Sequence, residues 1–342
     1  MARGAPAVAA LLAAVLFGAA TPLSKALLRE AAPAQLAGLL YLGAAAGLLP
    51  VVVWQRRRSR PVGRRGAIRL AGAIAFGGVV GPLLLLLGLQ LASATSVSLW
   101  LNLELVATAV LGQLFFREHL GRLGWVGVTG AALAGIILAG AEAGSGGIAA
   151  VLVTLACVCW GLDNHLTALI DEMSATQATF WKCGVAGTVN LLLGVATQPF
   201  AASSAVTAMA VVVGAFSYGA SIVLYVSSAQ QLGATRAQLL FATAPFFGLA
   251  LSAGLLPEPV TGAHLVAAAL MVASIGVVFA ARHAHPHAHA ALAHTHLHRH
   301  DDGDHTHDPA EAVSLVHAHW HEHGPVAHAH PHWPDLHHRH SH

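Results

Sequence analysis

Charged side chains are scarce in this 342-residue chain. Asp, Glu, Lys and Arg together make up 9% of the residues, whereas 56% of the residues are hydrophobic. Soluble globular domains carry a charge at roughly a quarter of their positions. The chain has only three cysteines, Cys157, Cys159 and Cys183, which lie in apolar stretches and do not form a disulfide framework. The scarcity of charge excludes a soluble globular domain and indicates a membrane protein.

The part of the chain before the histidine-rich C-terminus is a series of apolar stretches separated by short polar or Pro/Gly segments. A stretch of ~20 apolar residues crosses the hydrocarbon layer of a membrane. We therefore expect an all-α integral membrane protein with ten spanning helices, at 7–28, 34–54, 70–91, 95–116, 123–141, 147–169, 177–197, 205–229, 236–256 and 262–281. The connections between them are too short for a folded domain, so function must lie in the helix bundle or in the C-terminal tail.

Arginines concentrate between the second and third predicted spans. The seven in this region are Arg56, Arg57, Arg58, Arg60, Arg64, Arg65 and Arg69. Because cytoplasmic loops carry the excess of Lys and Arg, we expect this loop and both termini to be cytoplasmic, in a bacterial inner membrane. No aromatic residues interleave with the arginines, so no nucleic-acid partner is expected.

The two halves of the apolar part can be aligned with each other by a single constant offset. It places Leu99-Trp100-Leu101 on Leu239-Leu240-Phe241, and Glu118 on Glu258. Each half has five spans, an odd number, so the second half enters the membrane from the opposite side. Inverted repeats of this kind are typical of secondary transporters, although a static bundle duplicated only for stability is the alternative. The expected domains are two five-helix repeats and a histidine-rich tail, at 7–141, 147–281 and 283–342.

Several short motifs accompany the repeat. Phe17-Gly18 precedes Lys25 in the first half, Trp160-Gly161 precedes Asp163-Asn164 in the second, and a glycine-rich helix follows each of the two aligned glutamates. In this order and spacing, residues 7–281 resemble the EamA-type drug/metabolite transporter superfamily. The resemblance implies a permease for a small metabolite, an amino-acid-like solute or a drug. Together with the tail, the segment WGLDNHLT at 160–167 resembles a bacterial branch of that superfamily with His-rich C-termini.

Four ionisable residues fall well inside the predicted spans: Lys25, Glu104, Asp163 and Lys182. Such residues cost several kcal/mol unless they are paired or hydrated, and so mark candidate functional positions. The rise per residue of a helix gives the depth of each residue in the membrane. By depth, Lys25 and Glu104 are predicted partners, and Asp163 and Lys182 form a second predicted pair. The expected transport pathway consists of Lys25, Asn102, Glu104, Asp163, Asn164, His165 and Lys182. Hydrogen bonds that merely lock the helices together are the alternative role.

A mechanism follows as a hypothesis from these placements. A carboxylate such as Glu104 or Asp163 would carry a proton across the membrane, while a lysine would bind a carboxylate or phosphate of the solute. The aligned glutamates Glu118 and Glu258 lie at helix ends on opposite membrane faces, where a structural contact with loops or helix termini is expected. A gate is the alternative function for this glutamate pair.

Histidine is concentrated in the tail, which holds 21 of the 24 histidines, mostly in His-x-His patterns. Imidazole suits zinc, copper, nickel and cobalt. We expect a tail that is disordered without a ligand and that binds such metals in labile sites. The candidate ligands are His294, His296, His298, His300, His305, His307, His317, His319, His321, His323, His328, His330, His332, His337, His338, His340 and His342. Because imidazole titrates near pH 6.5, pH sensing is the alternative.

These features together predict a secondary transporter, with export as the expected direction and no required cofactor. Its expected partners are the lipid bilayer, a small solute, coupling protons and transition metal ions, with a homodimer as an open alternative to the monomer. One alternative function is a Zn, Ni or Co exporter whose tail collects the cargo. Another is an integral-membrane enzyme that uses Asp163 and His165, against which stands the absence of a ligand motif such as H-E-x-x-H.

Overall fold

A computed structural model of the chain describes residues 5–55, 62–115, 122–142, 144–170, 173–232, 240–280, 283–289, 292–299, 316–323 and 326–332. The chain forms two compact units, a helical unit within residues 1–281 and a tail unit within residues 282–333.

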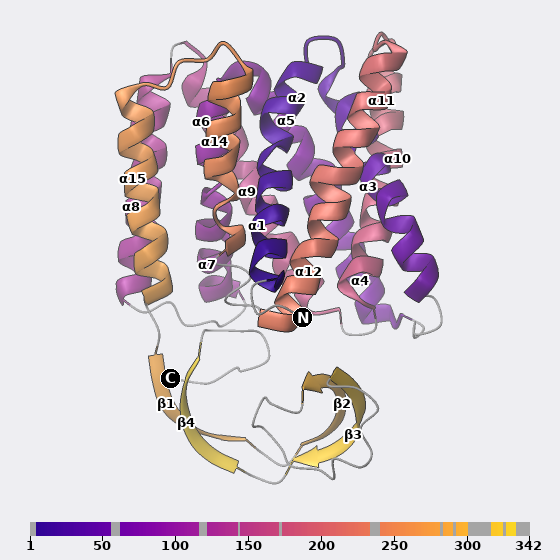
Figure 1. Cartoon of the computed structure of the whole chain (residues 1–342), viewed down its shortest axis with the longest axis vertical. Coiled ribbons are helices and arrows are strands. Elements are labelled where there is room, and N and C mark those ends of the chain that lie inside the picture. Colours follow the sequence, from indigo (N-terminus) through magenta and orange to yellow (C-terminus); the bar gives the residue numbers. More distant parts are fainter. Residues whose placement is uncertain are drawn as a thin grey trace. The chain divides into compact units, whose positions relative to one another are not determined.

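The helical unit is built from α-helices and two π-helices (Figure 1). Its elements are α1 (Ala5–Gly18), α2 (Ala20–Leu27), α3 (Pro33–Gln55), α4 (Arg64–Ala73), the π-helix η2 (Ile74–Val80), α5 (Gly81–Leu91), α6 (Ala94–Trp100), α7 (Leu103–Phe115), α8 (Arg122–Ala141), α9 (Gly146–Ala168), α10 (Ala175–Thr197), α11 (Ser204–Val213), the π-helix η3 (Gly214–Ala220), α12 (Ser221–Leu232), α14 (Ala244–Leu255) and α15 (Gly262–Ala280). Within the described residues, eight continuous helical segments are long and apolar enough to cross a membrane, and α14 and α15 are shorter apolar helices. These segments confirm the predicted all-α membrane fold.

A turn precedes each of α7 and α14. In the first half, residues 101–102 separate α6 from α7, and in the second half a turn at 242–243 precedes α14. At each turn a side chain donates to a carbonyl oxygen that also accepts a backbone N–H: Asn102 Nδ2 donates to Leu99 at 3.1 Å, and Thr243 Oγ1 donates to Leu240 at 2.6 Å. The two turns, one in each half, therefore have the same type of side-chain contact.

The two π-helices are also related by the repeat. They begin at Ile74 and at Gly214, and the offset that places Leu99 on Leu239 also places these two positions on each other. A π-helix adds a residue to a helical turn and is frequent at functional sites. Both halves therefore contain the same local distortion, in the third span of each.

The packing of the halves on each other follows the same symmetry. α5 packs on α9 as α12 packs on α1, and α7 packs on α9 as α14 packs on α1. Two further pairs join corresponding helices of the two halves, α3 with α10 and α8 with α15, and α6 of the first half packs on α14 of the second. Figure 1 shows α8 and α15 side by side at one edge, and α3 beside α10 at the other. The first helix of each half thus lies centrally between elements of the other half.

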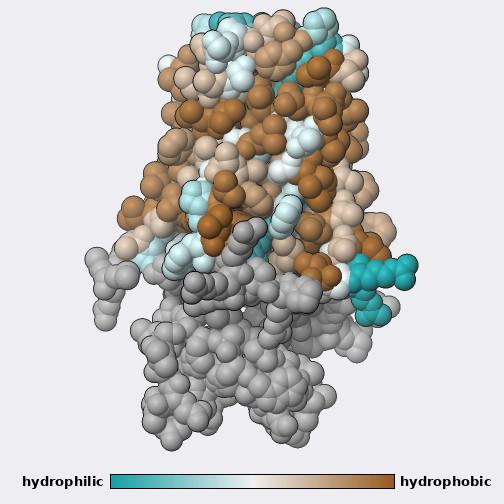
Figure 2. All heavy atoms as spheres, turned by 90° about the vertical axis from the view of Figure 1, so that its right-hand side faces the viewer, coloured by the Kyte–Doolittle hydropathy of each residue, from teal (hydrophilic) through white to brown (hydrophobic). Residues whose placement is uncertain are grey.

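Large apolar side chains cover the lateral surface of the helical unit. Figure 2 shows hydrophobic residues over the middle of one face and hydrophilic residues toward its upper end. Trp54 is 84% exposed, Ile136 68% and Leu192 66%, whereas Leu36 and Trp100 are fully buried. Such exposure would be costly in water, so this surface is suited to contact with lipid.

The tail unit contains four strands, β1 (His283–His289), β2 (Leu292–Arg299), β3 (Val316–His323) and β4 (Val326–His332). β1 pairs antiparallel with β4, and β2 with β3. The His-x-His alternation of the tail has the period of two of a β-strand. The register places histidine opposite histidine, as in His285 with His330 and His296 with His319.

Candidate functional site

A buried ion pair joins α9 to α10. Lys182 Nζ lies 2.6 Å from Asp163 Oδ2, with 16% of the lysine side chain and 5% of the aspartate side chain exposed. Thr167, one turn after Asp163 on α9, donates a hydrogen bond from Oγ1 to Asp163 Oδ1 at 2.9 Å. The pairing of Asp163 with Lys182, predicted from their common depth, is therefore present in the structure.

The π-helix η2 packs directly against this ion pair. A Cβ atom at Gly77 would lie 2.1 Å from Asp163 Oδ2, and one at Gly78 would lie 2.5 Å from the Cβ of Ala186 and 3.4 Å from Lys182 Cγ. Real Cβ atoms do not approach other atoms within 3.0 Å. The two consecutive glycines thus allow the backbone of η2 to contact both members of the pair.

Three polar side chains hold η2 in this position. Tyr41 Oη and Trp160 Nε1 both donate to the carbonyl oxygen of Gly77, at 2.9 and 3.0 Å, and Asn190 Nδ2 donates to that of Gly78 at 3.0 Å. Tyr41 is on α3, Trp160 on α9 and Asn190 on α10. A π-helix has i→i−5 hydrogen bonds in place of the i→i−4 bonds of an α-helix. The three side chains therefore bind two carbonyl oxygens of an irregular helical turn.

Glu104, in the first turn of α7, lies beside the pair. Asn164 Nδ2 donates to Glu104 Oε1 at 3.0 Å and contacts Thr108 Oγ1 at 3.4 Å. Glu104 is close enough to Asp163 and Lys182 for the three charges to interact. We call Glu104, Asp163, Asn164 and Lys182 the central cluster. It combines two carboxylates, one ammonium group and one amide.

His165 lies next to the cluster and is 4% exposed. Its Nε2 is 2.9 Å from the carbonyl oxygen of Thr108. A carbonyl oxygen only accepts hydrogen bonds, so Nε2 carries a proton and donates it. His165 therefore fastens α9 to α7 beside the contacts of Asn164.

The predicted pairing of Lys25 with Glu104 is wrong. Lys25 Nζ instead donates to the carbonyl oxygens of Leu89 and Ala92, at 2.6 and 2.8 Å. These carbonyls belong to the C-terminal end of α5, where unsatisfied acceptors and the helix dipole favour a cation. Lys25 and Glu104 lie at depths in the membrane that would let their side chains meet. The Lys25 ammonium group instead binds the C-terminal end of α5, outside the central cluster.

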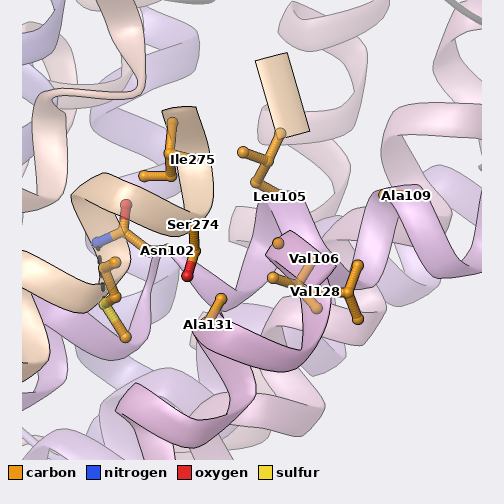
Figure 3. A pocket seen from close by; sticks show the side chains of 10 residues that line it. Asn102, Leu105, Val106, Ala109, Val128, Ala131, Ser274 and Ile275 are labelled. Atoms are coloured by element: carbon orange, nitrogen blue, oxygen red, sulfur yellow. Dashed lines mark hydrogen bonds between the residues drawn. The ribbon is translucent and has the colours of Figure 1, made fainter. Parts of the chain in front are cut away.

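Asn102 also lies apart from the central cluster. It is buried in the break between α6 and α7, with its Nδ2 atom 3.5 Å from Met271 Sδ. Figure 3 shows it beside a small, mostly apolar pocket, whose lining residues include Val106, Val128 and Ser274. Its contacts stabilise the break and provide few polar groups for a solute.

The remaining predicted positions lie elsewhere. Glu258 is in the loop between α14 and α15, where its Oε2 atom accepts a hydrogen bond from the backbone N–H of Thr95 at 3.1 Å. Its aligned counterpart Glu118 lies outside the described residues. Ten candidate metal ligands are on strands, His294, His296 and His298 on β2, His317, His319, His321 and His323 on β3, and His328, His330 and His332 on β4. His300, His305, His307, His337, His338, His340 and His342 lie outside the described residues.

Sequence reasoning missed several residues that build this site, namely Tyr41, Thr108 and Thr167. Gly77 and Gly78 were not predicted as part of the site either. One signal was available: Tyr41 is one of just three tyrosines in the chain, and its hydroxyl requires a partner within an apolar stretch. The carbonyl that it meets lies in a π-helix, whose position was not predicted.

Comparisons with known proteins agree with this architecture. A model of the EamA-like transporter family matches residues 5–140 and 147–280, which is more than half of the chain. An uncharacterized transporter from Methanothermobacter thermautotrophicus is 27% identical over 221 residues, covering 59% of this chain and 61% of that protein. The match thus spans less than two thirds of that relative's length. A protein crystal structure has a similar fold, with a TM-score of 0.59 at 15% identity, over 80% of this chain and 96% of the other. The chain belongs to the EamA-like transporter family.

Proposed function

We propose that the chain is a proton-coupled secondary transporter that exports a small amino-acid-like solute by alternating access. The observation that carries this proposal is the buried Asp163–Lys182 ion pair beside Glu104, at the junction of α9 and α10 with α7 and η2. Inverted-repeat transporters bind their solutes where the two halves meet. α7 and η2 belong to the first half and α9 and α10 to the second, so the central cluster meets this condition.

The charges of the central cluster provide a physical basis for coupling. In the part of the chain that the structure describes, Lys182 is the cation whose charge acts on both Asp163 and Glu104. With both carboxylates ionised, the cluster carries one excess negative charge. Such a charge is costly in an apolar environment, and either a proton on Glu104 or the ammonium group of a solute would neutralise it. A proton and a cationic solute group would therefore compete for the cluster. Such competition is what a transporter needs if it exchanges protons for solute.

The same ion pair is complementary to a zwitterion. The Lys182 ammonium would bind the carboxylate of an amino-acid-like solute, and the Asp163 carboxylate would bind its ammonium group. Each buried charge would then exchange one partner for another, which avoids leaving either charge unpaired. This chemical complementarity favours an amino-acid-like solute over an uncharged one.

The proposed direction and orientation rest on the placement of the charges along the helices. Asp163 lies near the C-terminal end of α9, and Lys182 lies in the first third of α10. Arg69, at the basic end of α4, donates to the carbonyl oxygen of Leu169 just after α9. The central cluster is thus nearer the arginine-rich end, which the excess of basic residues assigns to the cytoplasm of a bacterium. A site nearer that side supports uptake of solute from the cytoplasm, and hence export.

For the tail we propose labile binding of Zn, Ni, Co or Cu in a regulatory role. The backbone register that places histidine opposite histidine in both strand pairs supports this role, because histidine is a ligand suited to these metals. Metal export, with the tail collecting cargo, is the second candidate function. Within the helical part that the structure describes, however, no three His, Cys, Asp or Glu side chains are grouped as a metal site would require. This arrangement favours a solute other than a metal ion.

Flux measurements separate these functions. The full-length protein would be reconstituted in proteoliposomes and assayed with labelled amino acids and with zinc, nickel and cobalt. We expect amino-acid flux that responds to a pH gradient and persists when His317, His319, His321 and His323 are each replaced by Gln. Metal flux that falls in this histidine variant, without any amino-acid flux, would contradict the proposal and favour the metal exporter.

A further inference from the structure

A second polar cluster lies at the end of the bundle opposite to the central cluster. It connects the N-terminal end of α6, in the first half, to the loop before α15 and to α15 itself, in the second half. Glu258 Oε2 accepts from the backbone N–H of Thr95 at 3.1 Å, and Ser96 Oγ is 3.0 Å from His264 Nε2. We call Thr95, Ser96, Glu258 and His264 the latch. In Figure 1, α6 and α14 are labelled at the end remote from the N-terminus.

The hydrogen bonds of His264 define its protonation state. The backbone N–H of Thr261 lies 3.1 Å from His264 Nδ1, and Thr261 Oγ1 lies 2.8 Å from the same atom. A backbone N–H can only donate, so Nδ1 is an acceptor and the single ring proton is on Nε2. That proton points to Ser96 Oγ. The latch thus depends on a neutral, correctly oriented imidazole that is only 5% exposed.

Acidic groups and a lysine surround the latch. Ser93, the residue that caps α6, donates a hydrogen bond from Oγ to Glu142 Oε1 and accepts one from Thr95 Oγ1 at 2.9 Å. The charges of Glu142 and Glu258 both act on Lys25, which is itself bound to the end of α5. The start of α6 is therefore tied to both halves through polar contacts, in contrast to the apolar packing along the lateral helices.

The interface behind the latch contains two unpartnered hydroxyl groups. Ser98 Oγ on α6 and Ser252 Oγ on α14 are fully buried, and neither has a hydrogen-bond partner among the described residues. A Cβ atom at Gly248 of α14 would lie 2.8 Å from Ser98 Oγ and 3.1 Å from the carbonyl oxygen of Gly18. The contact between α6 and α14 is thus close but polar. A buried hydroxyl without a partner carries a desolvation cost, which water would relieve if the two helices separated.

We propose that the latch is the gate at the end of the bundle opposite the central cluster, and that its release separates α6 from α14 and admits water to Ser98 and Ser252. The proposal rests on the proposed alternating-access function. The hydrogen bonds of Glu258 and His264 hold the gate closed. Opening breaks them, but it also hydrates the hydroxyl groups of Ser98 and Ser252, and this hydration offsets part of the free energy lost with the broken bonds. Glu258 and His264 are positioning residues in this device, since neither belongs to the central cluster.

Cysteine labelling tests the gate without any solute. In the full-length chain with Cys157, Cys159 and Cys183 replaced by Ala, Ser252→Cys would be reacted with a membrane-impermeant maleimide applied to the side opposite the N-terminus. We expect slow labelling that becomes about tenfold faster with Glu258→Gln, the change expected from a loss of about 1.4 kcal/mol. Glu30→Gln is the matched control, because the hydrogen bond of Glu30 is accepted from Ser203, the residue that caps α11, and not from the latch.

A labelling rate that Glu258→Gln leaves unchanged, or that Glu30→Gln raises equally, would overturn the proposal. If Glu258→Gln does not give a monodisperse protein, Ser96→Ala removes the other contact of the latch and is expected to raise the rate in the same direction. Because labelling is measured without transport, faster labelling in a protein that moves no amino acid would support the gate and contradict only the proposed solute.

Discussion

The Asp163 carboxylate occupies the space that a side chain at Gly77 would need. An added Cβ at Gly77 would lie 2.1 Å from Asp163 Oδ2, the oxygen that binds Lys182 at 2.6 Å. Gly77 belongs to the π-helix of the first half and the ion pair to the second half. The contact therefore makes the position of the charged groups depend on how the two halves pack against each other.

Gly77→Ala is expected to displace the ion pair. Either the carboxylate or η2 must move to relieve the overlap with the added methyl group, so we predict a lower melting temperature in detergent and loss of most amino-acid flux. Gly140→Ala is the matched control, because an added Cβ there meets nothing within 4 Å and alanine favours a helix by up to about 1 kcal/mol. Equal behaviour of the two variants would contradict the proposed role of Gly77.

Removing one member of the ion pair should cost more than removing both. Lys182→Met leaves the Asp163 carboxylate buried without its partner, which destabilises proteins by about 3–5 kcal/mol. The double variant Lys182→Met with Asp163→Asn removes the unpaired charge and should recover part of the melting temperature. Thermal unfolding followed by circular dichroism measures both, with the exposed Arg29→Gln as control. A double variant that is less stable than Lys182→Met would show that the buried charge is not the cause.

Lys25→Met should affect stability and leave solute recognition unchanged. It removes two hydrogen bonds to the C-terminal end of α5, each to a charged donor and therefore worth about 1.5–3 kcal/mol. We expect a lower melting temperature, an unchanged KM for the solute, and partial recovery with Lys25→Arg. A raised KM at an unchanged melting temperature would instead place Lys25 in the transport pathway.

The membrane-spanning helical fold and the Asp163–Lys182 contact could be predicted because both depend on distance along a helix. Apolar length identifies a span, and the constant rise of an α-helix gives the depth of each residue within it. Asp163 and Lys182 lie at similar depths on consecutive helices joined by a short loop. For neighbouring helices of this kind, depth alone is enough to predict a contact.

Lys25, Tyr41 and Thr108 could not be placed in this way. Their partners depend on the lateral arrangement of helices, and helices that are apolar on all sides carry no periodic pattern that tells which face points inward. The depth of Lys25 was compatible with Glu104, yet its ammonium group binds Leu89 and Ala92. The partner of Tyr41 is a carbonyl in a π-helix, a distortion that composition did not reveal.

Metal binding by the tail should be multiple and sensitive to acid. Equilibrium dialysis of the full-length protein against zinc at about pH 7.4 is expected to give at most ~5 ions per chain at four ligands each. Binding should be largely lost at about pH 5, because imidazole, with a usual pKa of ~6.5, is then protonated and cannot act as a ligand. Replacement of His317, His319, His321 and His323 by Gln should lower the number of bound ions. Binding that acid or these replacements do not change would contradict tail histidines as ligands.

Glu104, beside the Asp163–Lys182 pair, is the residue that we expect to take up the proton that drives transport. The most direct test is amino-acid flux into proteoliposomes with and without a pH gradient, for the unaltered protein, for Glu104→Gln and for the exposed control Glu30→Gln. We predict that the unaltered protein and Glu30→Gln respond to the gradient and that Glu104→Gln does not. A flux of Glu104→Gln that rises with the gradient as strongly as that of the unaltered protein would contradict the account.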